Sequence, residues 1–155
     1  MTRLAHLALA YAAGSVGGAV TAVVIWLVGI LGVTAVAGVA IAPSLTPAWL
    51  YSRIVWGGLW GFLLLIALPD RWSWWQRGLL FSLGPTLVTW FVVFPLKAQV
   101  GVLGLDLGSL TPLFVVVFNG VWGLTTAAAM TLAEPGWIGR RRGPAPGPTG
   151  DAGVS

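Results

Sequence analysis

Side chains that commonly do acid–base or nucleophilic chemistry are scarce in this chain. It contains one histidine, four acidic residues and no cysteine. These are His6, Asp70, Asp106, Glu134 and Asp151. They are spread over the whole chain, and none stands in a nucleophile, phosphate-loop or metal-ligand motif. We therefore expect no catalytic residue, no metal site and no cofactor, and we expect that the protein is not an enzyme.

The chemistry that the sequence does favour is the binding of an anion. Four residues that can attract one lie at the ends of apolar segments or, for Arg53, inside one, and they are Thr46, Arg53, Lys97 and Thr111. Both threonines are followed by proline, a pair that is typical of a helix start, where the hydroxyl caps the helix and the N-terminus carries a partial positive charge. Together with Arg53 and Lys97, these two helix starts predict a site for a phosphate or carboxylate headgroup.

Arg53 stands out because it lies inside an apolar stretch. It follows Pro47 by six residues, which is ~9 Å along a helix that rises 1.5 Å per residue. Its side chain either extends along the helix to the membrane surface or points inward. In the second case the charge needs a partner, which could be Asp106 or a bound anion.

The composition of the chain suits lipid rather than water. Of the 155 residues, 57% are hydrophobic and only 8% are charged, whereas a soluble domain carries about 25% charged residues. The net charge of +4 would suit nucleic acid in a soluble protein, but here the basic residues are better explained by the charge asymmetry of membrane proteins. We expect membrane lipids as partners and no nucleic acid.

Four apolar stretches are long enough for membrane-spanning helices, which need ~20 residues. They cover about 7–31, 47–68, 74–94 and 112–132. The predicted fold class is therefore all-α, a polytopic membrane protein with four transmembrane helices in a domain over residues 1–138. Residues 139–155 are rich in Gly and Pro, and we expect them to form a disordered cytoplasmic tail.

The basic residues predict the orientation of these helices. Six of them fall on the side of both termini and two on the other side. The six are Arg3, Arg71, Arg77, Arg140, Arg141 and Arg142, and the two are Arg53 and Lys97. Because basic residues accumulate on the cytoplasmic side, we expect a multi-pass protein of the cell inner (plasma) membrane with both termini in the cytoplasm.

A tetrapeptide repeat suggests internal duplication. Ser-Leu-Thr-Pro occurs at 44–47 and again 65 residues later at 109–112, and the same shift aligns Gly58-Leu59 with Gly123-Leu124 and Thr21 with Thr86. The chain is then either two tandem helical hairpins of parallel orientation or a chain in which two helices acquired the same start independently.

Small and hydroxyl-bearing residues form one stripe on each predicted helix. Glycines let helix backbones approach closely, and hydroxyls and amides form hydrogen bonds between helices. The polar residues that we expect inside the bundle are Thr21, Ser82, Thr86 and Asn119. Four tryptophans fall at mid-depth and are expected to fill the core, namely Trp26, Trp56, Trp90 and Trp122.

Parts of the chain resemble a known group of proteins. The segments QRGLLFSLGPTLVTWFVVFPLK at 76–97, GSLTPLFVVVFNGVWGL at 108–124 and AYAAGSVGG at 10–18 are similar to an uncharacterised family of small bacterial four-span inner-membrane proteins with no assigned activity. The resemblance implies a bacterial membrane protein. It implies no functional residue, because the group has no assigned activity.

Two functions fit these observations. The first is a non-catalytic membrane component that packs through its Gly-rich helix faces, as a homo-oligomer or in a larger membrane complex. The alternative is a small transporter or lipid-handling protein with an outer-leaflet site for an anion or headgroup. A cavity that reaches Arg53, Asn119 or Thr86 would favour the alternative, whereas tryptophans that fill this space would favour the packing protein.

Overall fold

The computed structural model describes residues 2–69, 71–134 and 137, and every regular element in this part of the chain is a helix. Four helical segments are long and apolar enough to cross a membrane, namely Arg3–Ile30, Pro47–Leu65, Trp74–Ala98 and Thr111–Ala133. The predicted all-α fold with four such helices is confirmed at this level. The predicted tail, 139–155, lies outside the described residues.

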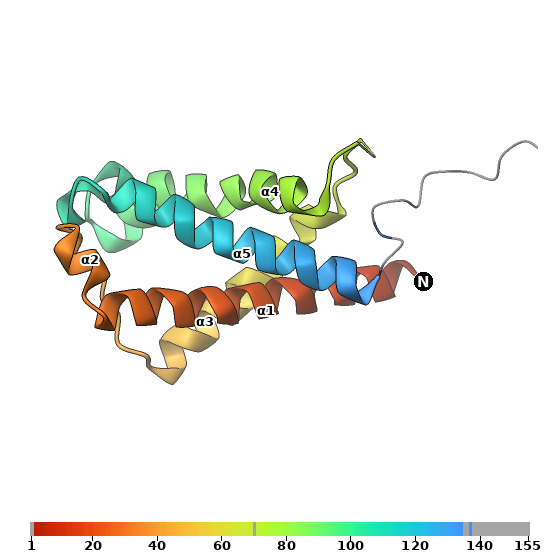
Figure 1. The fold of residues 1–155 in the computed structure, drawn as a ribbon, viewed down its shortest axis with the longest axis horizontal. Helices are drawn as coiled ribbons and strands as arrows, with labels where there is room; N and C mark the ends of the chain where they lie inside the picture. The colour runs from red at the N-terminus through yellow and green to blue at the C-terminus, as the bar shows by residue number, and fades with distance from the viewer. Residues whose placement is uncertain (1, 70, 135–136, 138–155) are drawn as a thin grey trace, which may run out of the picture.

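The helices alternate in direction along the chain (Figure 1). Their order is α1 (Arg3–Ile30), α2 (Val33–Val36), α3 (Pro47–Gly61), η1 (Phe62–Leu65), α4 (Trp74–Val88), η2 (Thr89–Ala98), η3 (Val102–Leu107) and α5 (Thr111–Ala133). The segment η2 is a π-helix that continues α4, and η1 is a 3-10 helix that continues α3. We call the end of the bundle with α2 and η3 the α2 end, and the end with Thr2 and Ala133 the terminal end.

The two Ser-Leu-Thr-Pro copies start their helices differently. Thr46 is the N-cap of α3, and its hydroxyl accepts a hydrogen bond from the Trp49 N–H at 3.3 Å. In the second copy the cap residue is Leu110, so the prediction that Thr111 caps its helix is wrong. The reason is a turn before the helix, in which the Thr111 N–H bonds to the Gly108 carbonyl at 3.1 Å and draws Thr111 into the first helical turn.

Helix α1 is the centre of the bundle because it packs against both α3 and α5. Its Gly14 and Gly18 face Gly57 on α3: a Cβ atom on Gly57 would lie 2.7 Å from the Gly14 carbonyl oxygen and 2.8 Å from the Gly18 Cα. Since carbon atoms do not approach that closely, these glycines set the distance between the two helices. The glycine stripes predicted from the sequence therefore face one another.

A different face of α1 holds α5. Gly17 lies against Trp122 and Thr126 of α5. The buried Trp122 indole Nε1–H donates to the Gly14 carbonyl oxygen at 3.2 Å. Helix α5 then packs on α4, where Gly78 and Gly123 are in backbone contact.

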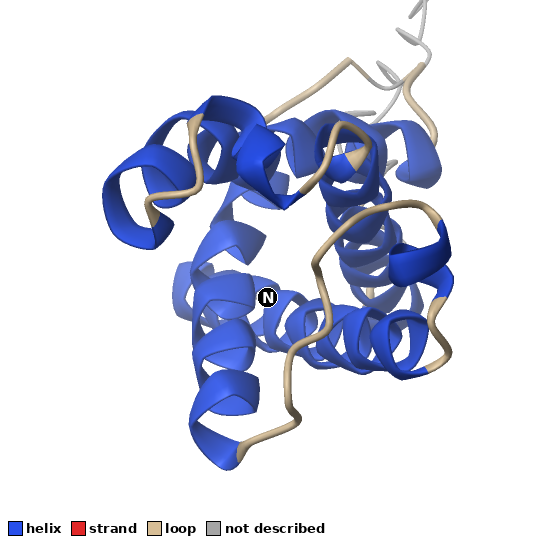
Figure 2. Cartoon of the chain, turned by 90° about the vertical axis from the view of Figure 1, so that its left-hand side faces the viewer, coloured by secondary structure: helices blue, strands red, loops and turns tan. Residues whose placement is uncertain are grey.

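The bundle is open on the side between α3 and η2. In the part of the chain that the structure describes, α3 packs on α1 and η1, and it has no comparable interface with α4 or η2. The Pro47 end of α3 diverges from the other helices in Figure 1. Viewed toward the α2 end in Figure 2, a long loop runs from α2 to the start of α3 across this opening.

Arg77 closes the terminal end of the bundle. Although it was counted as a surface charge in the prediction of orientation, its side chain is buried. The guanidinium donates to the carbonyl oxygens of Trp72 at 3.2 Å, Pro69 at 3.2 Å and Leu68 at 3.4 Å, and it lies 5.6 Å from the centre of the Trp137 ring. Arg77 thus holds the connection between η1 and α4.

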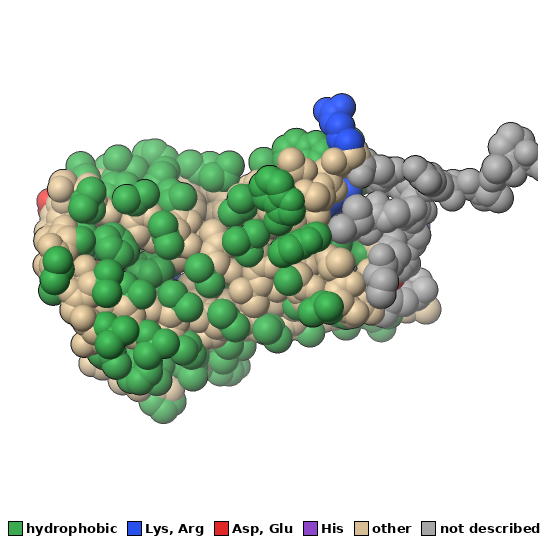
Figure 3. Space-filling view, in the orientation of Figure 1, with side chains coloured by type: hydrophobic (Ala, Val, Ile, Leu, Met, Phe, Trp, Pro, Cys, Tyr) green, Lys and Arg blue, Asp and Glu red, His purple; other side chains and the backbone are tan. Residues whose placement is uncertain are grey.

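Large apolar side chains cover the outside of the helices, and they spread along the whole visible face in Figure 3. Trp56 belongs to this surface, since 58% of it is exposed, and the prediction that it fills the core is wrong. The reason is that the Gly57 side of α3 is turned to α1, so its neighbour Trp56 points away. Trp122 is 3% exposed and does fill the core, and Trp90 is half-buried.

The glycine contacts lead to a stability prediction. Gly57→Ala is expected to destabilise the fold by ~1–3 kcal/mol, because the added methyl overpacks the α1–α3 contact. Thermal unfolding in detergent, followed by tryptophan fluorescence, measures the effect. Gly120→Ala is the matched control: its Cβ would meet only Leu79 Cδ2, at 3.8 Å, and should leave the unfolding temperature unchanged or raised. Equal stability of the two variants would contradict this packing.

Candidate functional site

A cavity of about 340 Å³ lies at the α2 end, on the open side of the bundle. This volume lies at the lower end of the range for small-ligand pockets, ~300–1,000 Å³, and corresponds to about eleven water molecules at ~30 Å³ each. Its walls come from α1, the segment 40–43, α3, η2, η3 and α5. Most of the lining is apolar, including Ile25, Phe94, Val115 and Phe118.

The wall formed by segment 40–43 is held in place from two sides. The Thr34 hydroxyl of α2 donates to the Ile41 carbonyl at 2.8 Å, and the Ala40 N–H donates to the Leu107 carbonyl of η3 at 2.7 Å. Through these bonds the two loops of the α2 end support each other. The wall of the cavity is therefore defined by hydrogen bonds and not by apolar contacts alone.

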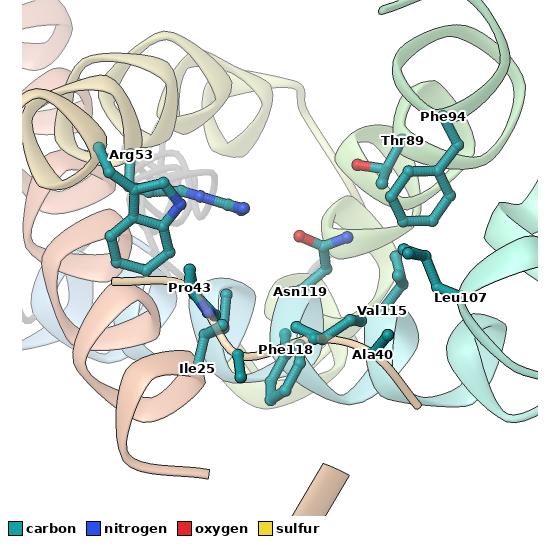
Figure 4. Close-up of a pocket in the computed structure, with 13 residues that line it drawn as sticks. Ile25, Ala40, Pro43, Arg53, Thr89, Phe94, Leu107, Val115, Phe118 and Asn119 are labelled. Atoms are coloured by element: carbon teal, nitrogen blue, oxygen red, sulfur yellow. The ribbon is translucent and has the colours of Figure 1, made fainter. Parts of the chain in front are cut away.

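Arg53 supplies the positive charge of the cavity. Its guanidinium carbon lies 5.3 Å from the centre of the Trp49 ring, one helical turn earlier on α3. Figure 4 shows the guanidinium extending from α3 into the cavity toward Asn119. Among the described residues, no carboxylate forms an ion pair with Arg53. The backbone of Arg53 is fixed, because its carbonyl oxygen lies against Gly18 of α1.

Asn119 faces Arg53 across the cavity, and its hydrogen bonds determine which of its atoms does so. The Thr86 hydroxyl donates its single proton to the Ser82 carbonyl at 2.7 Å. It can therefore only accept from Asn119, whose amide Nδ2 lies 3.1 Å away. The Asn119 carbonyl oxygen Oδ1 is left for the cavity, which agrees with the view in Figure 4.

Thr89 adds a second acceptor to the same wall. It is the first residue of the π-helix η2 and lines the cavity. Its hydroxyl donates to the Pro85 carbonyl at 2.7 Å, so only the lone pairs of its oxygen remain for a ligand. The cavity thus has a donor side at Arg53 and an acceptor side at Asn119 and Thr89.

The residues predicted to form the anion site are not all in this cavity. Arg53 lines it and is at the same time exposed, whereas Thr46 and Lys97 are exposed outside it and Thr111 is fully buried beside Gly104. All four belong to elements of the α2 end. The Arg53–Asp106 pair, considered from the sequence, is not formed: Asp106 is exposed and lies next to Gly101.

The polar residues predicted for the bundle interior lie there or at its edge. Thr21, Ser82 and Thr86 are buried, and Asn119 is half-buried at the cavity. Sequence reasoning did not assign Trp49 or Thr89 to a site. The spacing of Trp49 and Arg53, four residues apart on one helix, was the available signal, because such residues share a face.

One further contact between titratable side chains occurs at the terminal end. His6 Nε2 lies 3.3 Å from Glu134 Oε1, so this pair links α1 to the end of α5. It is far from the cavity along the bundle. Within residues 2–69, 71–134 and 137, no three His, Asp or Glu side chains gather into a metal-binding group.

Comparison with protein-family models, curated proteins and solved structures finds no match to this chain. The resemblance to small bacterial four-span proteins therefore remains a prediction from the quoted segments.

The cavity predicts a difference in chemical accessibility that is easy to measure, because the chain has no cysteine of its own. A cysteine in place of Asn119 should react with a small methanethiosulfonate reagent about tenfold or more faster than one in place of Thr86, because Asn119 lines the cavity and Thr86 is 1% exposed. Mass spectrometry of the purified variants gives both rates. Equal rates would show that the cavity is closed to small reagents.

Proposed function

We propose that this protein is a non-catalytic, multi-pass protein of the cell inner membrane that holds the anionic headgroup of a lipid in the cavity at Arg53. Two observations support the membrane part. Four helices are long and apolar enough to cross a bilayer, and large apolar side chains such as Leu83, Phe91 and Val117 are about half exposed on their outer faces. In water such a surface would drive aggregation.

The same orientation as that expected from the sequence is proposed here, with both termini in the cytoplasm. The exposed Arg3 and Arg71 lie toward the terminal end, whereas Lys97 and Asp106 lie at the α2 end and offset each other. Arg77 is buried and does not contribute to the excess of exposed basic residues at the terminal end. Among the described residues, this excess therefore consists of Arg3 and Arg71. The cavity then opens in the outer half of the membrane.

The single observation that carries the binding function is the setting of Arg53. Arg53 is exposed in the isolated bundle, but it lies within a segment long enough to span a bilayer, it lines a largely apolar cavity, and no carboxylate of the described residues neutralises it. Charges at such a depth are costly and are normally paired. A phosphate is the natural partner, because the planar guanidinium fork matches the geometry of its oxygens.

The contacts of the glycines argue against the packing function. Gly14, Gly18, Gly57, Gly78 and Gly123 are all used in contacts between helices of this chain. They are therefore not available to a second copy or to another membrane protein. The tryptophans do not fill the space at Arg53 either, so the lipid-handling alternative is the better supported of the two.

The orientation is tested with single cysteines at exposed positions near the two Ser-Leu-Thr-Pro starts. Ser44→Cys and Ser109→Cys should both react with a membrane-impermeant maleimide added outside intact cells, because both serines are exposed at the α2 end. Thr2→Cys, at the terminal end, should react only after the cells are lysed. Labelling of positions 44 and 109 from opposite sides would refute the four-span topology.

The binding function is tested by removing the charge. Arg53→Ala should reduce retention of phospholipids about tenfold in native mass spectrometry, because the loss of a charged hydrogen-bonding partner is worth ~1.5–3 kcal/mol. Lys97→Ala is the matched control, since it removes a cation from the same end but not from the cavity. Unchanged retention in Arg53→Ala, or an equal loss in Lys97→Ala, would contradict the proposal.

A further inference from the structure

The cavity presents the donors of Arg53 on one side and acceptor oxygens on the other. Arg53 offers N–H groups from α3. Opposite it, Asn119 turns its Oδ1 toward the cavity, because one N–H of its amide is held by the Thr86 oxygen, and Thr89 offers the lone pairs of its hydroxyl, because its proton is used in the bond to the Pro85 carbonyl. Figure 4 shows these side chains converging on the cavity from opposite walls.

This arrangement is more selective than a positive charge alone. A phosphodiester without a neighbouring donor would bind Arg53, but it would bring only acceptor oxygens to the acceptor oxygens of Asn119 and Thr89. An acceptor that stays unpaired after burial loses the hydrogen bonds it made with water. The wall therefore favours a ligand that carries a proton donor next to its anionic group.

Two hydrogen bonds in series, from the Asn119 amide to the Thr86 hydroxyl and from that hydroxyl to the Ser82 carbonyl, keep the Asn119 amide from rotating by 180°. If the amide flipped, its Nδ2–H would face the cavity, but Oδ1 would then face the Thr86 oxygen. Thr86 could satisfy it only by giving up its 2.7 Å bond to the Ser82 carbonyl. Both partners of this exchange are buried, since Thr86 is 1% exposed and Ser82 is 5% exposed. The acceptor orientation of Asn119 is thus set by the protein and not by the ligand.

We infer that the cavity selects lipids whose phosphodiester is joined to a hydrogen-bond donor, as in phosphoethanolamine or phosphoglycerol headgroups, over lipids that lack the donor. The phosphate binds Arg53, and the ammonium or hydroxyl group donates to Asn119 and Thr89. The inference rests on the proposed function and names its ligand class. The lipid approaches from the open side of the bundle, where the described residues of α3 and η2 form no interface comparable to that between α3 and α1.

The test compares lipids that differ only in the donor. The full-length protein is presented with phosphatidylethanolamine against phosphatidylcholine, in which methyl groups replace the N–H protons, and with phosphatidylglycerol against phosphatidylmethanol, which keeps the negative charge but lacks hydroxyl groups. Retention is measured by native mass spectrometry at equal lipid concentration. In each pair the donor-bearing lipid should be retained about fivefold better.

Variants of the acceptor residues test whether the preference for donor-bearing lipids arises in the cavity. Asn119→Leu keeps the size of the side chain but removes the acceptor, and it should lower the retention of each donor-bearing lipid to that of its donor-free partner. Thr89→Val, which removes the second acceptor, should reduce the preference and serves if Asn119→Leu does not fold. A preference in either pair that these variants remove supports the inference, and absence of preference in both pairs, or a preference that the variants leave intact, overturns it.

This outcome is separate from that of the proposed function. If Arg53→Ala retains phospholipid like the wild type, the headgroup site itself fails. If Arg53→Ala loses the lipid but the paired lipids bind equally, the site stands and only its selectivity is rejected.

Discussion

The close approach of three helices at the glycines of α1 is the constraint on which the rest of the structure depends. Gly14 and Gly18 admit the backbone of α3, and Gly17 admits α5. Neighbouring glycines serve different partners because successive residues of an α-helix point ~100° apart. The Trp122 indole then bonds to the Gly14 carbonyl, so the same turn of α1 that contacts α3 also binds α5.

This central role of α1 explains why the bundle has an open side. In two equivalent hairpins, α3 would pack on α4 as α5 packs on α1. The described interfaces instead join α3 to α1, α1 to α5 and α5 to α4. The Ser-Leu-Thr-Pro copies differ in the same way, since Thr46 caps its helix and Thr111 is buried within the first turn of α5. If the chain arose by duplication, the two halves have since acquired different contacts. The cavity lies on the open side between α3 and η2, where the packing departs from that of two equivalent hairpins.

The polar side chains that line the cavity come from both halves of the chain. Arg53 comes from the first hairpin and is aimed by the contact of its carbonyl with Gly18. Asn119 and Thr89 come from the second, where the Thr86 oxygen holds one N–H of Asn119 and the Pro85 carbonyl takes the hydroxyl proton of Thr89. Neither half alone offers both a cation and an acceptor wall. We therefore regard ligand binding, and not further helix packing, as the role that this geometry supports.

The sequence by itself determined the elements of this protein. Long apolar stretches and Thr46-Pro47 predicted four helices and one helix start, because hydrocarbon length and capping are local properties. The spacing of glycines predicted which faces would meet, because residues three or four apart share a helix face.

Only the tertiary structure decided which elements are neighbours, and therefore what the site contains. Trp56 and Trp122 are both flanked by glycine, yet one is exposed and the other is buried. In the sequence Arg77 is indistinguishable from a surface charge. In the structure it is buried and donates to the carbonyl oxygens of Leu68, Pro69 and Trp72. Thr46, Lys97 and Thr111 were grouped with Arg53 because all four lie at one end, but the tilt of α3 brings Asn119 and Thr89 to face it instead. Depth along a helix can be counted in a sequence, whereas rotation and tilt follow from contacts between residues far apart in the chain.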